Sequence, residues 1–329
     1  MVKAETKKIF IISSILIIVL ALSFFAALSF GAEKISFGSV FGRGDKFDNI
    51  ILWNIRLPRA LLVLLTGILL GGSGAVFQLF FQNPLAEPGI MGISSGATLG
   101  AVIATLGTGF TTSKLISSVN LSAFFGALLA GLFVTALAFN KSRKNSSIML
   151  LLCGTALGTL YSSISSAILL TCNKELHSIY TWILGSFNGR SWNELLFILI
   201  PSGISILIMI LISPQLDLLT CGEKSAESLG VEVNRLRILV LICGSLAMSS
   251  AVCAGGTIGF VGLIAPHIVR KLSGPKSRSL IPLSMIFGAI LLLVSDLLAR
   301  VIIAPAELPA GIITSILGVP FFISLCLKK

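Results

Sequence analysis

Residues 56–100, RLPRALLVLLTGILLGGSGAVFQLFFQNPLAEPGIMGISSGATLG, join two long apolar runs through a short polar interruption. The part from 82 to 100 contains Pro84, Glu87, Pro88 and four glycines. A run of about 20 apolar residues is long enough to cross a bilayer as a helix. Proline removes a backbone donor and ends the helix before it. The stretch therefore predicts two membrane helices, with Pro84 and Pro88 as the residues that break the helix between them.

The composition of the whole chain agrees with a membrane protein. The chain has 329 residues, of which 55% are hydrophobic and 11% are charged, and its mean hydropathy is +1.02. Soluble domains have about 25% charged residues. We expect an all-α integral membrane protein, with a ten-helix transmembrane bundle forming a single domain over residues 1–329. The apolar runs lie at about 9–31, 60–81, 90–110, 118–139, 147–171, 193–213, 236–255, 257–270, 280–300 and 308–327.

The basic residues indicate how the chain lies in the lipid bilayer. With ten spans and a cytoplasmic N-terminus, 15 of the 24 lysines and arginines fall on the cytoplasmic side. This bias predicts a multi-pass protein of the inner or plasma membrane with both termini in the cytoplasm. The net charge of +11 is spread over loops and membrane edges, so it does not indicate a nucleic-acid-binding face.

Residues typical of an enzyme or a metal site are scarce. The six cysteines include no CxxC pair, there are only two histidines, and no GxxxxGK[ST] phosphate loop occurs. We therefore predict no catalytic residue, no metal site and no cofactor bound by this chain. Glycines at four-residue spacing, such as Gly67 and Gly71, are interpreted as points where helices pack closely.

Two segments outside the regular spans admit more than one interpretation. The segment 217–237, DLLTCGEKSAESLGVEVNRLR, contains a predicted helix between Gly222 and Gly230. It is either a docking element for a partner or an interfacial helix without one. The interruption within 82–100 is either an ordinary cytoplasmic loop or a re-entrant or tight turn near a water-accessible route. A carboxylate such as Glu87 is costly at membrane depth, where it usually lines a cavity or pairs with a partner.

Three long blocks resemble one protein family. Residues 56–100, residues 255–275 (GGTIGFVGLIAPHIVRKLSGP) and residues 296–329 (DLLARVIIAPAELPAGIITSILGVPFFISLCLKK) closely resemble permease subunits of ABC importers for ferric siderophores, haem and vitamin B12. These are the FecCD/BtuC-like permeases of type II importers. The resemblance covers essentially the whole chain.

The resemblance implies a set of partners and a transport activity. It implies two copies of this chain in the bilayer around a central pathway, an extracytoplasmic substrate-binding protein, and two cytoplasmic ABC ATPase subunits that hold ATP and Mg. The cargo is expected to be a ferric siderophore, the broadest class, with haem and cobalamin as alternatives. An ion-coupled secondary transporter is the competing hypothesis, for which only Glu87, Asp296 and Glu307 are candidate coupling residues.

The resemblance also implies roles for particular residues. His267, in APHIVR, is expected to have a structural role, such as hydrogen bonding at a helix kink. The other implied sites are binding-protein docking by Arg56, Arg59 and Arg300, ATPase coupling by Gly222, Ala226, Leu229 and Gly230, and a cytoplasmic gate at Asn83, Leu85, Ser146 and Ser147.

Overall fold

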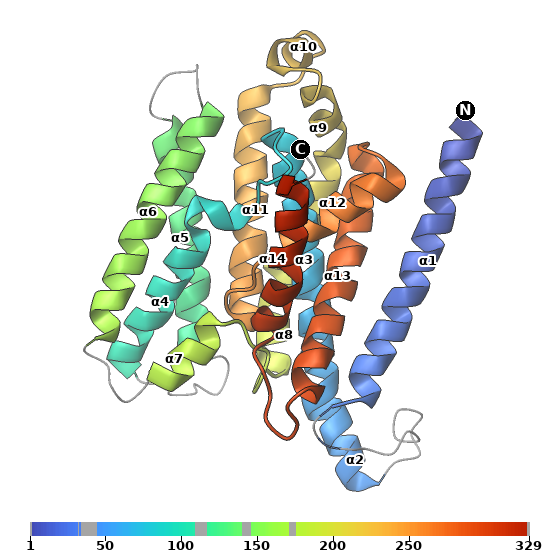
Figure 1. The fold of residues 1–329 in the computed structure, drawn as a ribbon. Helices are drawn as coiled ribbons and strands as arrows, with labels where there is room; N and C mark the ends of the chain where they lie inside the picture. The colour runs from blue at the N-terminus through green and yellow to red at the C-terminus, as the bar shows by residue number, and fades with distance from the viewer. Residues whose placement is uncertain are drawn as a thin grey trace.

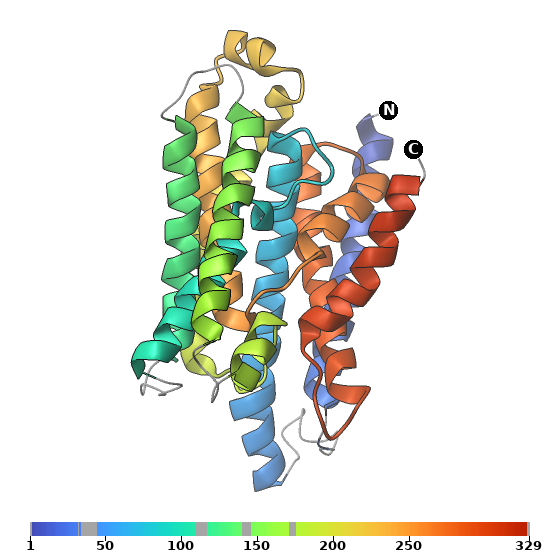
Figure 2. The ribbon, with the colours of Figure 1, turned by 60° about the vertical axis from the view of Figure 1, so that its left-hand side comes forward.

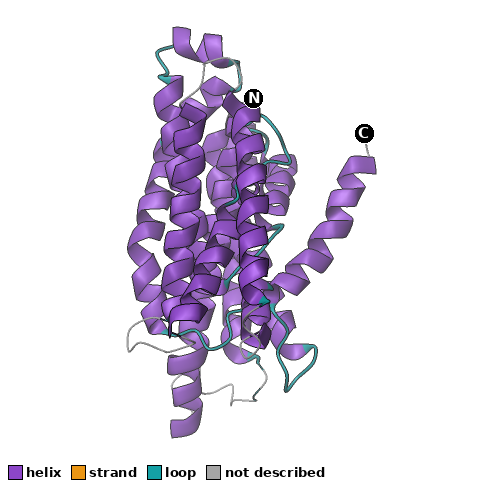
Figure 3. Cartoon of the chain, turned by 90° about the vertical axis from the view of Figure 1, so that its left-hand side faces the viewer, coloured by secondary structure: helices purple, strands orange, loops and turns teal. Residues whose placement is uncertain are grey.

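The computed structural model describes residues 2–31, 33, 45–108, 117–139, 146–170 and 176–327. Within these ranges the regular elements are helices, and no β-strand occurs (Figure 3). The elements are α1 (Val2–Ser29), α2 (Lys46–Ile50), the π-helix η2 (Ile51–Arg56), α3 (Leu57–Phe80), the 3₁₀ helix η3 (Pro88–Met91), α4 (Ile93–Thr108), α5 (Ser118–Phe139), α6 (Ser146–Leu169), α7 (Leu176–Ile183), α8 (Trp192–Leu211), α9 (Ser213–Leu219), α10 (Glu223–Ser228), α11 (Val233–Gly255), α12 (Val261–Ser273), α13 (Ser277–Val301) and α14 (Ala310–Leu327).

Seven helical segments in the described part of the chain are long and apolar enough to cross a membrane. Two further apolar helices, Ile93–Leu106 and Ala310–Ser324, are shorter, and α12 has 13 residues. The prediction of an all-helical membrane bundle is therefore confirmed. Each of the ten predicted apolar runs contains a helix, but length and composition do not establish ten crossings, so that number stays a prediction.

The long helix α3 forms the centre of the bundle. It continues from α2 and η2 as one helical segment, Lys46–Phe80, whose most apolar window is 78% buried. Helices α11, α12 and α13 lie around it (Figure 1). By contrast, α1 lies at the periphery against α13, and only 6% of its apolar window is buried.

Close helix contacts explain the four-residue spacing of the glycines. A Cβ atom added at Gly71 would lie 2.1 Å from the carbonyl oxygen of Ser284, and one added at Gly67 would lie 2.5 Å from Cα of Ala289. Both contacts join α3 to α13. On α4, a Cβ at Gly100 would lie 2.2 Å from the carbonyl oxygen of Ser122 on α5. These glycines therefore pack helices within one chain, as their spacing predicts.

The connector between α3 and α4 runs back into the bundle before α4 begins (Figure 2). Helix α3 ends at Phe80, Gln82 has a φ of 49°, and helical structure resumes at Pro88. Met91 is fully buried, and a Cβ at Gly92 would lie 2.8 Å from the carbonyl oxygen of Gly154 on α6. The later part of the connector is therefore packed inside the chain, whereas Gln82, Pro84 and Leu85 are exposed. The packing of the later part supports the re-entrant interpretation over an ordinary surface loop.

The short helices α9 and α10 protrude at one end of the molecule. The beginning of α1 and the end of α14 lie toward the same end, whereas α2 and α7 lie at the opposite end (Figures 1 and 2). This arrangement separates two sets of candidate functional residues.

Candidate functional site

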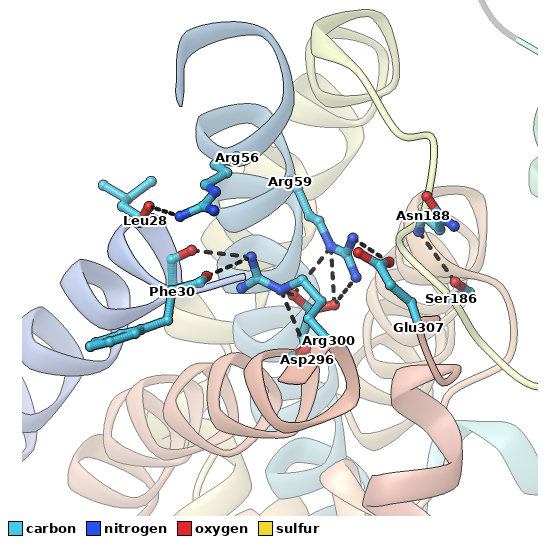
Figure 4. Close-up of polar contacts among 10 residues, drawn as sticks. Leu28, Phe30, Arg56, Arg59, Ser186, Asn188, Asp296, Arg300 and Glu307 are labelled. Atoms are coloured by element: carbon cyan, nitrogen blue, oxygen red, sulfur yellow. Dashed lines mark hydrogen bonds and ion pairs between the residues drawn. The ribbon is translucent and has the colours of Figure 1, made fainter. Parts of the chain in front are cut away.

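The end of the bundle opposite α10 holds a cluster of buried charges, which we call the arginine cluster (Figure 4). Its positive residues are only 3–6% exposed, although each carries a full charge. Charges buried to this degree need partners, because desolvation without compensation is costly. The π-helix η2 and the start of α3 supply two of the residues, the end of α13 supplies two, and the loop before α14 supplies one. The cluster consists of Arg56, Arg59, Asp296, Arg300 and Glu307.

Asp296 bridges two arginines at the centre of this cluster. Its Oδ1 lies 2.9 Å from Nη2 of Arg59, and its Oδ2 lies 3.1 Å from Nε of Arg300. Nη1 of Arg59 also lies 2.8 Å from Oε2 of Glu307. The Asp296 side chain is 1% exposed, so its two ion pairs are screened little by water.

The remaining guanidinium hydrogens bind the end of α1. Nη1 of Arg56 donates to the carbonyl oxygens of Leu28 at 2.9 Å and Ser29 at 2.7 Å. Nη1 of Arg300 donates to the carbonyl oxygens of Ala27 at 3.2 Å and Phe30 at 3.3 Å. The last carbonyl groups of a helix lack partners within the helix and carry partial negative charge. The two arginines therefore cap the C-terminus of α1 and attach it to the core.

The three arginines predicted to dock a binding protein are thus brought together, but they are not exposed in this chain. Their guanidinium groups bind internal carboxylates and carbonyl groups, which the sequence did not reveal. Their docking role stays a prediction. Asp296 and Glu307, considered as ion-coupling residues, are instead counter-ions of Arg59 and Arg300.

At the other end, α10 forms a small knob bounded by two glycines. Gly222 has a φ of 102° and Gly230 a φ of 87°, a left-handed conformation that other residues rarely adopt. Leu229, at the end of α10, is 63% exposed. Ala226, by contrast, is fully buried within the chain, so its side chain supports the knob and is not available on its outer surface. An ion pair of 3.2 Å between Glu223 and Arg237 attaches α10 to α11.

The predicted gate residues lie in the connector between α3 and α4. Asn83 stabilises the turn itself, because its Oδ1 accepts a hydrogen bond of 2.9 Å from the backbone N–H of Leu85. Leu85 is 36% exposed. Ser146 and Ser147 begin α6, but their side chains lie outside the described residues. Their predicted part in the cytoplasmic gate therefore stays a prediction.

Glu87 follows this turn and borders a cavity of about 230 Å³. The cavity is lined by the connector, α3, the start of α4, α11, the segment that links α11 to α12, and the start of α12. Among the described residues, none forms a hydrogen bond or ion pair with the Glu87 carboxylate. Of the two possibilities raised by the sequence, cavity and partner, the structure supports the cavity.

One candidate feature was missed at the sequence level. Helix α6 exposes a line of five hydroxyl residues on a helix that is otherwise rich in leucine and isoleucine. Each lies three or four residues from another member of the set, which places them on neighbouring positions of one helix face, so the helical period was the signal that could have identified them. We call this face the hydroxyl stripe: Thr155, Thr159, Ser162, Ser163 and Ser166.

The expected hydrogen bond of His267 is not present. Both imidazole nitrogens are buried without a hydrogen-bond partner among the described residues. The ring instead contacts Phe321 of α14, with the ring centroids 5.6 Å apart and an edge-to-face geometry. The ring of His267 thus packs against an apolar partner in the described structure, and its structural role stays a prediction. In the described ranges no group of three metal-binding side chains occurs either.

The sequence model of the FecCD transport family matches residues 16–328 of the chain. The chain belongs to the FecCD transport family. The match includes the connector, the α10 knob and the arginine cluster, so the resemblance found in the three sequence blocks is confirmed.

Relatives across this FecCD family are named as permeases. The iron(3+)-hydroxamate import system permease protein FhuG of Bacillus subtilis is 34% identical over 99% of both chains. The vitamin B12 import system permease protein BtuC of Citrobacter koseri is 37% identical over 96% of this chain and 94% of its own. The FecCD chain is therefore similar to the permease components of import systems, not to their ATPases.

Solved structures agree with the FecCD assignment. An ABC transporter of the metal-chelate type, solved in an inward-facing conformation, superposes with a TM-score of 0.86 at 32% identity and covers 97% of this chain and 99% of its own. The structure of PsaBC from Streptococcus pneumoniae with a Fab has a TM-score of 0.60 at 16% identity, over 84% of this chain and 92% of its own. At that identity the similarity shows the fold alone.

Proposed function

We propose that this chain is the membrane-spanning permease subunit of an ATP-driven importer whose cargo is a ferric siderophore. Haem and cobalamin are the alternative cargoes. The observation that carries the proposal is the TM-score of 0.86 over 97% of the chain to an ABC transporter of the metal-chelate type. The hydroxamate and vitamin B12 permeases among the relatives support the cargo class but do not distinguish its members.

The proposed assembly places two copies of the chain side by side in the inner or plasma membrane. Each copy is a single transmembrane domain with ten crossings and both termini in the cytoplasm. An extracytoplasmic binding protein delivers cargo at the end that holds the arginine cluster. Two ABC ATPases, which hold ATP and Mg, bind at the α10 end. The location of α10 and both chain ends on one side of the bundle supports this orientation (Figure 1).

The α10 knob is the proposed contact for the ATPase. An apolar side chain that is 63% exposed outside the membrane spans gains most by burial against a partner, and Leu229 is such a residue. The ion pair between Glu223 and Arg237 would carry movement of the knob to α11, which packs against α3. ATP binding and hydrolysis would thereby tilt the spans and alternate access between the two sides of the membrane.

The hydroxyl stripe of α6 is the proposed wall of the central pathway. Lipid gives no hydrogen-bond partner to an exposed hydroxyl, whereas water and an oxygen-rich chelate do. Several of these hydroxyls bond back to their own helix, as Thr159 does to the carbonyl oxygen of Thr155 at 2.9 Å. They therefore offer weak, uncharged contacts, along which a bulky cargo would move without being trapped.

The proposal is tested by the association of the chain with its ATPase. We expect Leu229→Asp to abolish or strongly reduce copurification of the coexpressed ATPase, because a charge would be placed in an apolar contact. Leu184→Asp is the matched control, since Leu184 is 44% exposed and follows α7 at the opposite end. ATPase that binds the unaltered chain and the Leu184 variant but not the Leu229 variant supports the proposal. Absence of any ATPase with the unaltered chain contradicts it.

A further inference from the structure

The Glu87 carboxylate lies in the connector inside the bundle, without a partner among the described residues. A carboxylate in such surroundings is costly when ionised, because the residues that line the cavity give it no full counter-charge and only part of the residue is open to water. The three acids in the described ion pairs, Asp296, Glu307 and Glu223, each have an arginine beside them. The Glu87 carboxylate therefore differs from these acids, because it borders a cavity and has no cationic side chain beside it among the described residues.

The atoms nearest to Gly89 show which groups lie close to the Glu87 carboxylate. A Cβ atom placed on Gly89 would lie 3.6 Å from Oε1 of Glu87, 3.5 Å from Oγ of Ser94 and 3.9 Å from Cε of Met248. The carboxylate and the hydroxyl thus converge on one point beside an apolar methyl group. Both oxygens are hydrogen-bond acceptors, and the ionised carboxylate accepts only.

The rest of the cavity lining contains no positive side chain. It consists of apolar residues, hydroxyls and glycines, including Leu70, Thr257 and Gly262. The other carboxylate oxygen, Oε2, lies 3.9 Å from the position of a Cβ on Gly262, in the first turn of α12. The partial positive charge of that helix end compensates the carboxylate in part but does not provide a full counter-charge.

We propose that Glu87 and Ser94 form a subsite for a monovalent cationic group of ammonium size. One carboxylate and one hydroxyl suit an ammonium, whereas a divalent metal would require more ligands, and no group of three candidate ligands occurs in the described residues. The volume of about 230 Å³ holds such a group with several waters. The cation comes either from a side arm of the cargo or from solution.

Helix α4 connects the subsite to the proposed pathway through two consecutive serines. Ser95, beside Ser94, has its Oγ 3.3 Å from Oγ of Ser162 in the hydroxyl stripe. A chelate that passes along the stripe could therefore extend an ammonium arm into the cavity. The cargo source of the cation rests on the proposed function, whereas binding of the cation itself does not.

Transport measurements distinguish the two sources. ATP-driven uptake into proteoliposomes is compared for a ferric trihydroxamate with a terminal primary amine and for its N-acetyl derivative. The same binding protein is used with every variant of the chain. Any preference of the binding protein for one chelate is therefore the same for all variants and does not affect their comparison. If cargo supplies the cation, Glu87→Gln lowers the preference for the amine about tenfold, as expected for loss of a hydrogen bond to a charged group. Asp45→Asn, an exposed carboxylate away from the cavity, is the control and leaves the preference unchanged.

A solution cation gives a different pattern. Replacing Na⁺ and K⁺ by N-methylglucamine then slows uptake of the acetylated chelate by the unaltered chain but not by Glu87→Gln. Either pattern supports the subsite. The subsite is overturned if Glu87→Gln keeps the preference for the amine chelate and uptake by the unaltered chain does not depend on Na⁺ or K⁺.

A binding measurement keeps the subsite testable if transport fails. Dicyclohexylcarbodiimide attacks protonated carboxyl groups, so we expect it to label Glu87 of the purified chain in nanodiscs, as located by mass spectrometry. Butylammonium, Na⁺ or K⁺ should slow this labelling, and Ser94→Ala should weaken the protection. Absence of labelling, or labelling that none of these cations slows, overturns the subsite. Failure of the unaltered chain to take up either chelate would contradict the proposed function alone.

Discussion

At the residue scale, the single carboxylate of Asp296 forms ion pairs with two buried arginines. It lies 2.9 Å from Arg59 and 3.1 Å from Arg300, with 1% of its side chain exposed. Removing one partner of a buried ion pair leaves an uncompensated charge, which costs more than the pair itself contributes. The two arginines also bind different elements, so loss of Asp296 would loosen both.

We therefore expect Asp296→Asn to destabilise the chain by about 3–5 kcal/mol. Glu307→Gln is the matched control, because Glu307 pairs with Arg59 alone and its side chain is 20% exposed. Its effect should be smaller, about 1 kcal/mol. Thermal unfolding in nanodiscs, followed by the fluorescence of the three tryptophans, measures both. A Glu307 variant that unfolds as early as the Asp296 variant would contradict this assignment.

At the scale of elements, close glycine contacts determine how α3 and α13 pack. A Cβ on Gly71 would lie 2.1 Å from a backbone oxygen of α13, and a backbone cannot move aside as a flexible side chain can. In a membrane the hydrophobic effect does not drive helices together, so close van der Waals packing at small residues contributes much of the association. The contact thus fixes the core on which the connector and α12 depend.

Gly71→Ala should accordingly separate the two helices and lower stability by about 1–3 kcal/mol. Gly203→Ala is the matched control, since no atom lies within 4 Å of the added Cβ on α8. Alanine should be neutral or slightly stabilising there, because it favours the helix. Unfolding in detergent with increasing dodecyl sulfate compares the two variants. Equal stability of both variants would show that the α3–α13 contact is not needed.

The elements were largely predictable from the sequence, but their partners were not. Apolar runs located the helices, and Gly222 and Gly230 bounded α10, because these signals are local. The ion pair between Arg59 and Asp296 joins residues 237 positions apart, so no local pattern predicts it. The same holds for His267 and Phe321, and for the cavity at Glu87, which forms only where the connector meets the α11–α12 segment.

For the whole molecule, the two ends of the bundle have different chemistry. One end carries the arginine cluster with three positive and two negative side chains, and the other carries the apolar Leu229 on the α10 knob. Between them, the hydroxyl stripe provides polar groups on the exposed face of α6, and the Glu87 cavity provides them among the packed helices. This division suits a permease that receives cargo at one end and binds an ATPase at the other.

The energy source of transport distinguishes an ATP-driven importer from an ion-driven transporter most directly. The measurement is accumulation of radioactive iron, supplied as a ferric siderophore, by proteoliposomes that contain the chain and its ATPase, with binding protein on one side and ATP on the other. We predict accumulation that requires ATP and binding protein and that an ionophore does not diminish. Accumulation that proceeds without ATP and collapses with the ionophore would contradict the account.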